Sequence, residues 1–332
     1  MNVLSVAYPL LPAGPDAGGG AEQILSLLDR GLTQNGNQSI VIAAEGSCVS
    51  GELIATPAVR GEITEDLRRA AQKNHLCHIE GALTRYPIDQ IHFHGLDFHQ
   101  YVPETDVPML ATLHLPLAWY PDWIFSASPT RLNCVSRTQA AERGLPFVEN
   151  GIDLERYAAV DGEREHLLWL GRICPEKGVH VALEVAHELD MQIVVAGPVH
   201  RFREHEAYFR EKIQPLLDCK RKYIGLVGVA QKVNLLRKSI CLLIPSLVKE
   251  TSSLVAIEAA ASGLPVVAFR AGALPEIVED GVTGFVVDSQ AEMAIAIRRI
   301  RDISSEICRA RANVRFDARR MVDDYLKLYA AR

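Results

Sequence analysis

Short apolar runs alternate along the chain with segments whose apolar residues recur every three or four positions. The run NVLSVAY at 2–8 is typical of a strand, and AEQILSLLDRGLTQNG at 21–36 is typical of an amphipathic helix. Repeated alternation of these two patterns predicts βαβ units around a parallel sheet. Further predicted strands are QSIVIAAE, QIHFHG, PMLATLH, RLNCVS, HLLWLGR, MQIVVAG, YIGLVG, ICLLIPS, PVVAF and GFVVD.

The alternation stops once, in the polar stretch Ala158–Glu165, and then begins again. The strands of the second series are nearly continuous apolar runs, as expected where helices cover both faces of a parallel sheet. This pattern predicts two doubly wound, Rossmann-like α/β domains at 1–155 and 156–312, followed by a last segment at 313–332. Ligands of such sheets bind at the carboxyl ends of the strands, so the loops that follow the strands are the places to search.

The cysteine content, the lengths of the apolar stretches and the charge distribution indicate which class of protein this is. The chain has 332 residues and seven scattered cysteines without a CxxC pair, which is typical of reduced thiols in a cytoplasmic protein. No basic region precedes the first apolar run, and no apolar stretch is long enough to cross a bilayer. Residues 1–155 hold 9 Lys/Arg against 18 Asp/Glu, which argues against nucleic acid or an anionic membrane as a partner. The later part is mildly basic and suits a small anionic ligand.

A glycine-rich loop, AGPDAGGGAEQ, lies between the first predicted strand and helix. Backbone N–H groups at such a helix start favour an anion or a polar ligand. A dinucleotide fingerprint would need a third glycine where Gln23 stands, although Glu45 ends the second strand, where a ribose-binding acid would lie. A nicotinamide cofactor is therefore the less favoured interpretation.

Histidines gather in IHFHGLDFH, as His92, His94 and His99. Two histidines on one face of a strand can bind zinc, but a histidine in an apolar strand is more often part of the core. His114 ends another apolar strand, before Trp119 and Tyr120, and a histidine beside aromatic rings suits a sugar.

The loop LGRICPEKG places Arg172 and Lys177 beside a helix start. A guanidinium binds phosphate oxygens as a fork and an ammonium adds a point charge, so the pair suits a diphosphate. The alternative is two surface cations in a solvated loop.

Two glutamates, Glu250 and Glu258, lie eight positions apart in KETSSLVAIEAAASG. The pattern predicts a helix at 252–262, capped by Ser252 or Ser253 and ended by Gly263. Glu258 would then share a face with apolar residues, where an ionised carboxylate needs hydrogen-bond donors. A ligand diol would supply two, whereas a carboxylate that reaches out to solvent would need none.

Taken in order, these motifs resemble the retaining glycosyltransferases of family 4, which have the GT-B fold of two Rossmann-like domains facing across a cleft. The resemblance covers almost the full chain and rests on GGAE, SRTQAAE, NGIDLERY, LGRICPEKG, AGP, the E-x7-E pair, ASGLPVVAF, ALPEIV and DGVTGFVV. It implies that the C-terminal helix crosses back to the N-terminal domain.

The resemblance implies a role for each matching residue. Arg172 and Lys177 would hold the donor diphosphate, Glu258 the ribose hydroxyls, and Glu250 the donor sugar. His114 would lie near the anomeric carbon. Further donor contacts are expected at Ser252, Ser253, Leu254, Val255, Gly197 and Gly228, and contacts with phosphate or acceptor at Gly19, Gly20 and His94. Ser252 and Ser253 replace the aromatic residue and glycine usual in the family, which bears on the choice of sugar.

The expected reaction is transfer of a sugar from a nucleotide-diphosphate-sugar to an acceptor hydroxyl, with retained configuration. No D-x-D motif occurs, so neither a metal nor another cofactor is expected. The acceptor is unknown, and peripheral membrane contact is not favoured. The alternatives are a GT-B epimerase acting on nucleotide-sugars and a catalytically silent protein that binds them.

Overall fold

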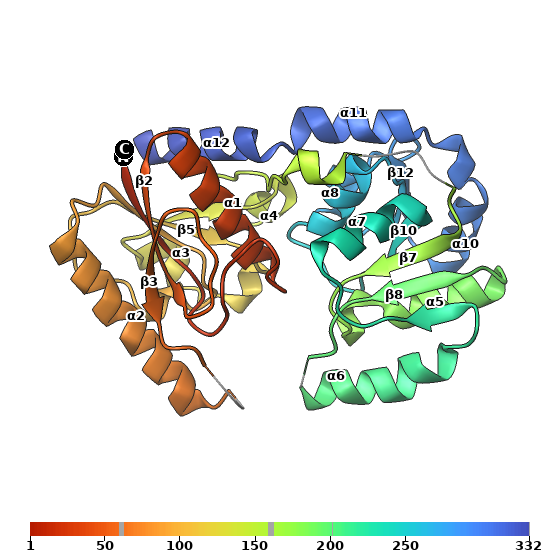
Figure 1. Cartoon of the computed structure of the whole chain (residues 1–332), viewed down its shortest axis with the longest axis horizontal. Coiled ribbons are helices and arrows are strands. Elements are labelled where there is room, and N and C mark those ends of the chain that lie inside the picture. Colours follow the sequence, from red (N-terminus) through yellow and green to blue (C-terminus); the bar gives the residue numbers. More distant parts are fainter. Residues whose placement is uncertain (60–62, 159–162, 201, 332) are drawn as a thin grey trace. The chain divides into compact units, whose positions relative to one another are not determined.

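The computed structural model describes residues 1–59, 63–158, 163–200 and 202–331 (Figure 1). The chain forms two compact units, which are described separately. Unit 1 consists of Met1–Gly151 with Ala318–Arg332, and unit 2 of Ile152–Asp317. The sequence pattern predicted divisions after residues 155 and 312.

Unit 1 is built on a parallel sheet of six strands in the order β3-β2-β1-β4-β5-β6. Its β1 strand is aligned with β2 from Asn2 opposite Gln38 to Val6 opposite Ile42. The strands are β1 (Asn2–Val6), β2 (Gln38–Ala44), β3 (Glu52–Thr56), β4 (Gln90–Phe93), β5 (Met109–Leu113) and β6 (Arg131–Cys134).

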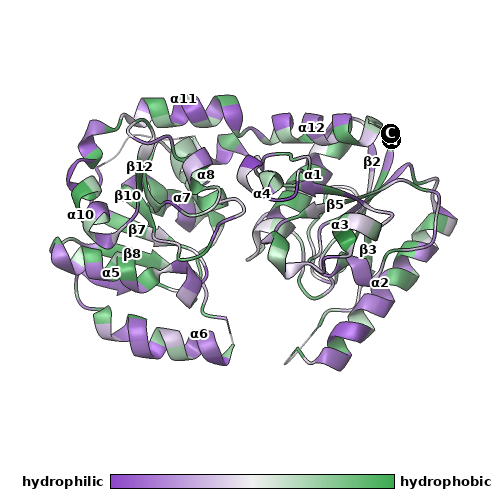
Figure 2. Ribbon diagram, turned by 180° about the vertical axis from the view of Figure 1, so that it is seen from behind, coloured by the Kyte–Doolittle hydropathy of each residue, from purple (hydrophilic) through white to green (hydrophobic). Residues whose placement is uncertain are grey.

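The helices of unit 1 come from both ends of the sequence. They are α1 (Gly20–Gln34), α2 (Glu65–Arg85), α3 (Ile124–Ala127), α4 (Arg137–Ala141) and α12 (Ala318–Ala330). The last helix packs against α1 where Gly31 lies beside Val322, at a spacing that leaves no room for a Cβ on Gly31. Apolar residues follow the central strands in Figure 2, whereas α2 is largely hydrophilic.

Unit 2 repeats the arrangement, with a parallel sheet in the order β12-β11-β10-β7-β8-β9. Its strands are β7 (His166–Leu170), β8 (Ile193–Ala196), β9 (Arg221–Tyr223), β10 (Ser239–Ile244), β11 (Val266–Phe269) and β12 (Gly284–Val287). Its helices are α5 (Val179–Glu188), α6 (Arg203–Tyr208), α7 (Val229–Lys238), α8 (Leu254–Ala261), α9 (Leu274–Ile277), α10 (Gln290–Arg298) and α11 (Ser305–Arg315). Buried side chains fill both faces of the sheet.

All strands of each sheet are parallel, but the direction in which the chain adds strands reverses at one point in the strand order. In unit 1 the chain winds outward from β1 on one side and from β4 on the other, and in unit 2 from β7 and from β10. Loops that leave neighbouring strands in opposite directions open a crevice at this point, and open α/β sheets bind their ligands there. The loops after β7 and β10 are therefore the first place to look in unit 2.

One predicted strand was wrong, and several elements were missed, among them β3 and α2. The run YIGLVG at 223–228 is not a strand, because β9 ends at Tyr223 and Gly225 has a φ of 75°. Its Leu226 is 71% exposed. The short strand β3 and the long helix α2 were not predicted; α2 turns few apolar side chains inward, so its sequence shows little helical periodicity.

Candidate functional site

The predicted donor-binding residues all belong to unit 2, and three charged ones lie on the loops that follow β7 and β10. Arg172 and Lys177 lie in the first of these loops, and Glu250 lies in the second. The two loops are in direct contact, because the N–H of Leu247 donates to the carbonyl of Glu176 over 2.8 Å. The crevice predicted by the strand order therefore carries the predicted charged groups.

The first loop depends on a glycine. Residues Pro175–Lys177 form one 3-10 turn, and Gly178 follows with a φ of 65° before α5 begins. A Cβ at Gly178 would overlap the backbone carbonyl of Pro245, which leads into the second loop. Glycine is needed here both for its backbone conformation and for the close approach of the two loops.

Lys177 and Glu250 form an ion pair. The Lys177 Nζ lies 2.6 and 2.7 Å from the two carboxylate oxygens of Glu250, and the hydroxyl of Ser246 donates to Glu250 Oε1 over 2.7 Å. The pair is partly shielded from water, with side-chain exposures of 26% and 10%. Each group therefore neutralises the other.

Arg172 differs from Lys177 in this respect. Its side chain is half-buried, and within the described ranges its guanidinium makes no ion pair or hydrogen bond. It lowers the pKa of His200 by repulsion, after the larger effect of burial, so its charge is felt inside the loop region. Arg172 is therefore a cation held near the crevice without a counter-ion from the described residues.

Glu258 lies in the second turn of α8 and is only 2% exposed. Its Oε1 accepts hydrogen bonds from the Tyr157 hydroxyl at 2.7 Å and from Lys232 Nζ at 2.5 Å. Burial and the neighbouring carboxylate raise the pKa of Tyr157, which stays a donor. The buried Oε2 has no hydrogen-bond partner in the described part of the chain. An unsatisfied buried oxygen of this kind costs about 1–3 kcal/mol, and a ligand hydroxyl would satisfy it.

Tyr157 and Lys232 were not predicted as site residues. Tyr157 ends the motif NGIDLERY, and Lys232 lies on α7. The signal that could have found them is the requirement for donors near Glu258, but the sequence does not show which of the chain's many donors meets it.

The start of α8 matches the prediction closely. Ser253 is the N-cap, and its hydroxyl accepts from the N–H of Ala256. That oxygen is thus already used by the helix. The N–H groups of Leu254 and Val255 belong to the first turn, where a helix supplies no internal acceptor and donors remain for a ligand.

Two predicted glycines have different surroundings. Gly197 has a φ of 143°, and its Cβ position is filled by the backbone carbonyl of Gly171, so it lets the loops after β7 and β8 touch. Gly228 is the N-cap of α7 and has open space around its Cβ position.

In unit 1, the buried His94 and the half-buried His114 form a pair. His94 Nδ1 and His114 Nε2 are 3.0 Å apart. Burial lowers the pKa of His114 to about 4, and burial with the neighbouring histidines lowers the pKa of His94 well below its usual value. Both rings are therefore neutral at pH 7, which suits hydrogen bonding rather than a positive charge. Gly19 and Gly20 form the N-cap and first residue of α1, after β1.

The zinc alternative at the histidine cluster is not supported by the contacts of His92. Its two ring nitrogens face the hydroxyls of Tyr329 and Thr112 at 2.7 and 2.8 Å, as in a satisfied core histidine. His99 packs its ring edge-on against Trp123 instead.

Residues 164–302 match the family model described as glycosyl transferases group 1. Among solved structures, the whole chain superposes on sucrose-phosphate synthase from Thermosynechococcus elongatus with a TM-score of 0.82 at 17% identity, covering 100% of both chains. AviGT4, a glycosyltransferase involved in avilamycin A biosynthesis, matches with a TM-score of 0.72 at 22% identity, over 99% of this chain and 97% of that one. The fold is GT-B.

Curated relatives of this GT-B protein match over part of their length. A lipopolysaccharide 1,2-N-acetylglucosaminetransferase of Salmonella typhimurium is 26% identical over 208 residues, covering 59% of this chain and 52% of that protein. A D-inositol 3-phosphate glycosyltransferase of Saccharomonospora viridis is 30% identical over 220 residues, covering 57% and 51%. The chain spans about half the length of these relatives. Among the helices described, none is both long and apolar enough to cross a membrane.

Proposed function

We propose that this protein is a retaining glycosyltransferase that moves a sugar from a nucleotide-diphosphate-sugar to an acceptor hydroxyl. The observation that carries the proposal is the half-satisfied carboxylate of Glu258, in the same unit as the charged loops after β7 and β10. A buried acid with one oxygen held by protein donors and the other unfilled is a receptor for a hydroxyl group. The match to group 1 glycosyl transferases over residues 164–302 supports the same class of reaction.

Glu258 is the proposed ribose contact. Tyr157 and Lys232 hold its Oε1, which fixes the plane of the carboxylate and leaves Oε2 for a ribose hydroxyl. A charged acceptor of this kind gives a stronger hydrogen bond than a neutral one. This contact belongs equally to the bound donor and the transition state, so it governs donor affinity.

Arg172 and Lys177 are proposed to stabilise the departing nucleoside diphosphate. Lys177 is paired with Glu250 and Lys232 with Glu258, whereas Arg172 has no counter-ion among the described residues and so offers its charge to a ligand. The N–H groups at the start of α8 add partial positive charge. Groups fixed where negative charge develops lower the barrier without reorganisation, and losing one costs about 10²–10³ in rate.

Glu250 is proposed to face the donor sugar, with its carboxylate held by Lys177 and Ser246. No side chain in this set is placed as a covalent nucleophile, which favours a front-face route. In it the acceptor oxygen bonds to the anomeric carbon as the bond to the phosphate oxygen breaks, and the phosphate takes the acceptor's proton. Unit 1 is proposed to serve the acceptor, with His114 orienting the sugar and with Gly19, Gly20 and His94 contacting phosphate or acceptor. The donor sugar, the base and the acceptor are left to experiment, and transfer is proposed to need no metal and to occur in the cytoplasm.

The test is release of free nucleoside diphosphate from a panel of UDP-, GDP- and ADP-sugars, with and without candidate acceptors and with EDTA. A solved neighbour of this fold is described as a complex with UDP-glucose, so UDP-sugars come first in the panel. We expect Arg172→Ala to lower kcat about 10²–10³-fold and Arg298→Ala, an exposed arginine on α10, to leave it unchanged.

Each rival function predicts a different result in this assay. An epimerase would interconvert sugars without net release of diphosphate. A silent binding protein would show a donor-dependent rise in melting temperature and no release. Inversion of the anomeric configuration in the product would overturn the retaining mechanism while leaving transfer itself in place.

A further inference from the structure

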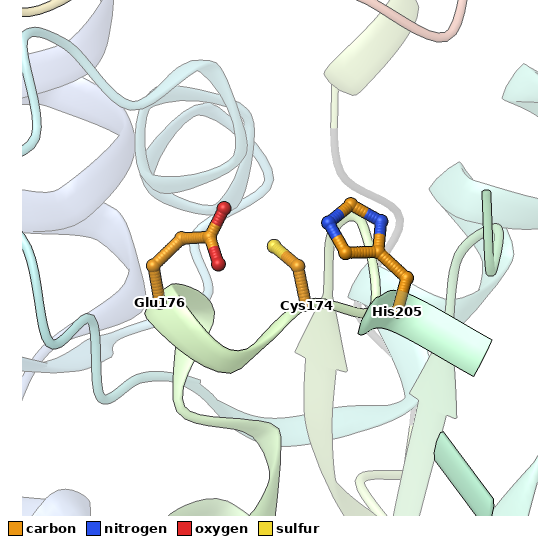
Figure 3. A group of neighbouring side chains, drawn as sticks. All are labelled: Cys174, Glu176 and His205. Atoms are coloured by element: carbon orange, nitrogen blue, oxygen red, sulfur yellow. The ribbon is translucent and has the colours of Figure 1, made fainter. Parts of the chain in front are cut away.

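Three side chains of unit 2 with metal-binding chemistry meet away from Glu258. Cys174 and Glu176 belong to the loop after β7, and His205 belongs to α6. Their candidate ligand atoms, a thiol sulfur, a carboxylate oxygen and an imidazole nitrogen, all lie within 4.8 Å of one another. Figure 3 shows the Cys174 sulfur between the Glu176 carboxylate and the His205 ring, with one ring nitrogen directed toward the sulfur.

Few protein hydrogen bonds reach this cluster from outside. Cys174 is fully buried, and its sulfur has a weak contact 3.6 Å from the carbonyl of Arg172 and a hydrogen-bond interaction with the Glu176 carboxylate inside the cluster. Within the described residues neither ring nitrogen of His205 takes a hydrogen-bond partner, and its Nδ1 is buried. A buried imidazole without partners beside a thiol and a carboxylate is costly unless another group binds there.

The chemistry of the three ligands selects among ions. Thiolate and imidazole are ligands for borderline-soft ions such as zinc, whereas calcium and magnesium prefer sets made of oxygen alone. Tetrahedral zinc, with bonds of about 2.0–2.3 Å, holds its ligand atoms roughly 3.3–3.8 Å apart. The three ligand atoms lie at most 4.8 Å apart, so they must move about 1 Å closer together to bind one ion, and rotation of the side chains can supply this shift.

We propose that Cys174, Glu176 and His205 bind one zinc or similar divalent ion, with a fourth position taken by water. A thiolate and a carboxylate balance the two positive charges of the ion. The ion would join α6 to the turn Pro175–Lys177, whose Glu176 carbonyl already accepts from Leu247 in the next loop. It would therefore brace the loop that carries Arg172 and Lys177, without taking part in transfer. The proposal does not depend on the function proposed above, because its test reads binding alone.

The test is titration of the reduced full-length protein with cobalt(II), a coloured substitute for zinc. We expect one equivalent to bind and to give a thiolate-to-cobalt charge-transfer band, with tetrahedral d–d absorption. Zinc should then displace the cobalt and abolish both signals. Cys174→Ala should abolish the charge-transfer band, and Glu176→Gln or His205→Ala should weaken binding at least tenfold.

Two matched variants exclude accidental binding. Cys219→Ala removes an exposed cysteine of the same unit, and His187→Ala removes an exposed histidine; both should bind like the wild type. Lack of a charge-transfer band in the wild-type protein overturns the proposal, as does a band removed by Cys219→Ala and kept by Cys174→Ala. If Cys174→Ala does not fold, as judged by circular dichroism, His205→Ala decides, and unchanged affinity in that variant overturns the proposal.

Discussion

Glu258 shows at the scale of one residue why a carboxylate can stay charged on an otherwise apolar helix. Lys232 and Tyr157 donate to one of its oxygens, and they come from α7 and from the segment before β7. A buried ion pair is worth little against an apolar pair of the same size, but breaking it leaves an unpaired buried charge. Stability alone therefore does not account for this pair, whereas the ribose contact proposed above would use the free oxygen of Glu258.

Lys232→Met should destabilise unit 2 by about 2–4 kcal/mol and raise the KM for the donor, because Glu258 loses its counter-ion in a buried site. Urea unfolding and donor kinetics measure the two effects. The double variant Lys232→Met with Glu258→Gln removes both charges and should recover most of the stability, but not the donor affinity. Equal losses in the single and double variants would show that the pair is not coupled.

The histidines of unit 1 should make stability depend on pH. The pKa of histidine in the unfolded chain is about 6.5, and burial lowers the pKa of His114 in the folded chain to about 4. Between these two pH values the folded state therefore binds fewer protons than the unfolded state. Stability is fully present above about pH 6.5 and falls as the pH falls through this window. At pH 5, His114 alone lowers the free energy of unfolding by about 2 kcal/mol relative to its value above pH 6.5.

His114→Gln should remove that part of the pH dependence, because glutamine does not titrate. Urea unfolding at pH 7.5 and pH 5 gives the difference for the wild type and the variant. His187→Gln, on the exposed surface of α5, is the control. A variant whose stability falls as steeply as the wild type between the two pH values would contradict the assignment.

At the scale of elements, the site depends on how two loops meet at the carboxyl ends of β7 and β10. Gly178 lets the first loop approach the backbone at Pro245, and the Leu247–Glu176 hydrogen bond joins the loops a few residues away. Lys177 precedes Gly178 directly, so the position of its ammonium group depends on this contact. The geometry of the ion pair therefore rests on backbone packing as well as on charge.

Gly178→Ala should lower the free energy of unfolding by about 3 kcal/mol or more and lower kcat at least 100-fold. The reason is that the new Cβ strains the backbone and displaces Pro245. The matched control is Gly225→Ala, at a φ of 75° with open space around the Cβ position. This control should lower the free energy of unfolding by only about 1 kcal/mol, because alanine strains the left-handed backbone conformation but meets no neighbour. Thermal unfolding and diphosphate release measure both variants, and equal effects would show that the contact with Pro245 is unimportant.

At the scale of the whole molecule, the C-terminal helix belongs to the unit built from the start of the chain. Met321, Val322, Tyr325 and Tyr329 of α12 are at most 5% exposed. Tyr329 and Tyr325 also bond to His92 and Thr112 in the sheet of unit 1. The core of this unit is therefore completed by its most distant segment in the sequence.

A chain ending at Asp317 should keep unit 2 folded and lose most of the stability of unit 1. Four buried side chains contribute roughly 6–12 kcal/mol, which is comparable to the total stability of a domain. Hydrogen exchange resolved by peptide should show rapid exchange in β1, β4 and β5 and retained protection in β7 and β10. The control ends at Ala330 and keeps α12; continued protection of unit 1 in the shorter chain would contradict this role.

Local patterns predicted much of this fold, because they depend on residues close together in the sequence. Apolar runs identified most strands, and Ser253 and Gly263 marked the ends of α8. The prediction failed at YIGLVG, where an apolar run carries glycines and bends away from the sheet, and at α2, whose mainly exposed side chains lack periodicity. The charged residues in the loop after a strand also predicted Arg172 and Lys177 as a pair, and the family resemblance added Glu250, which the structure places beside Lys177.

The sequence by itself determined two parallel α/β units and the loops that carry the groups proposed to bind the donor, since periodicity and turn residues act over a few positions. Only the tertiary structure decided which atoms pair. Lys177 and Glu250 are 73 positions apart, Lys232 and Glu258 are 26 apart, and Tyr157 and Glu258 are 101 apart. Contacts over such separations depend on the order of strands in the sheet and on the packing of loops at their ends, which no local pattern specifies.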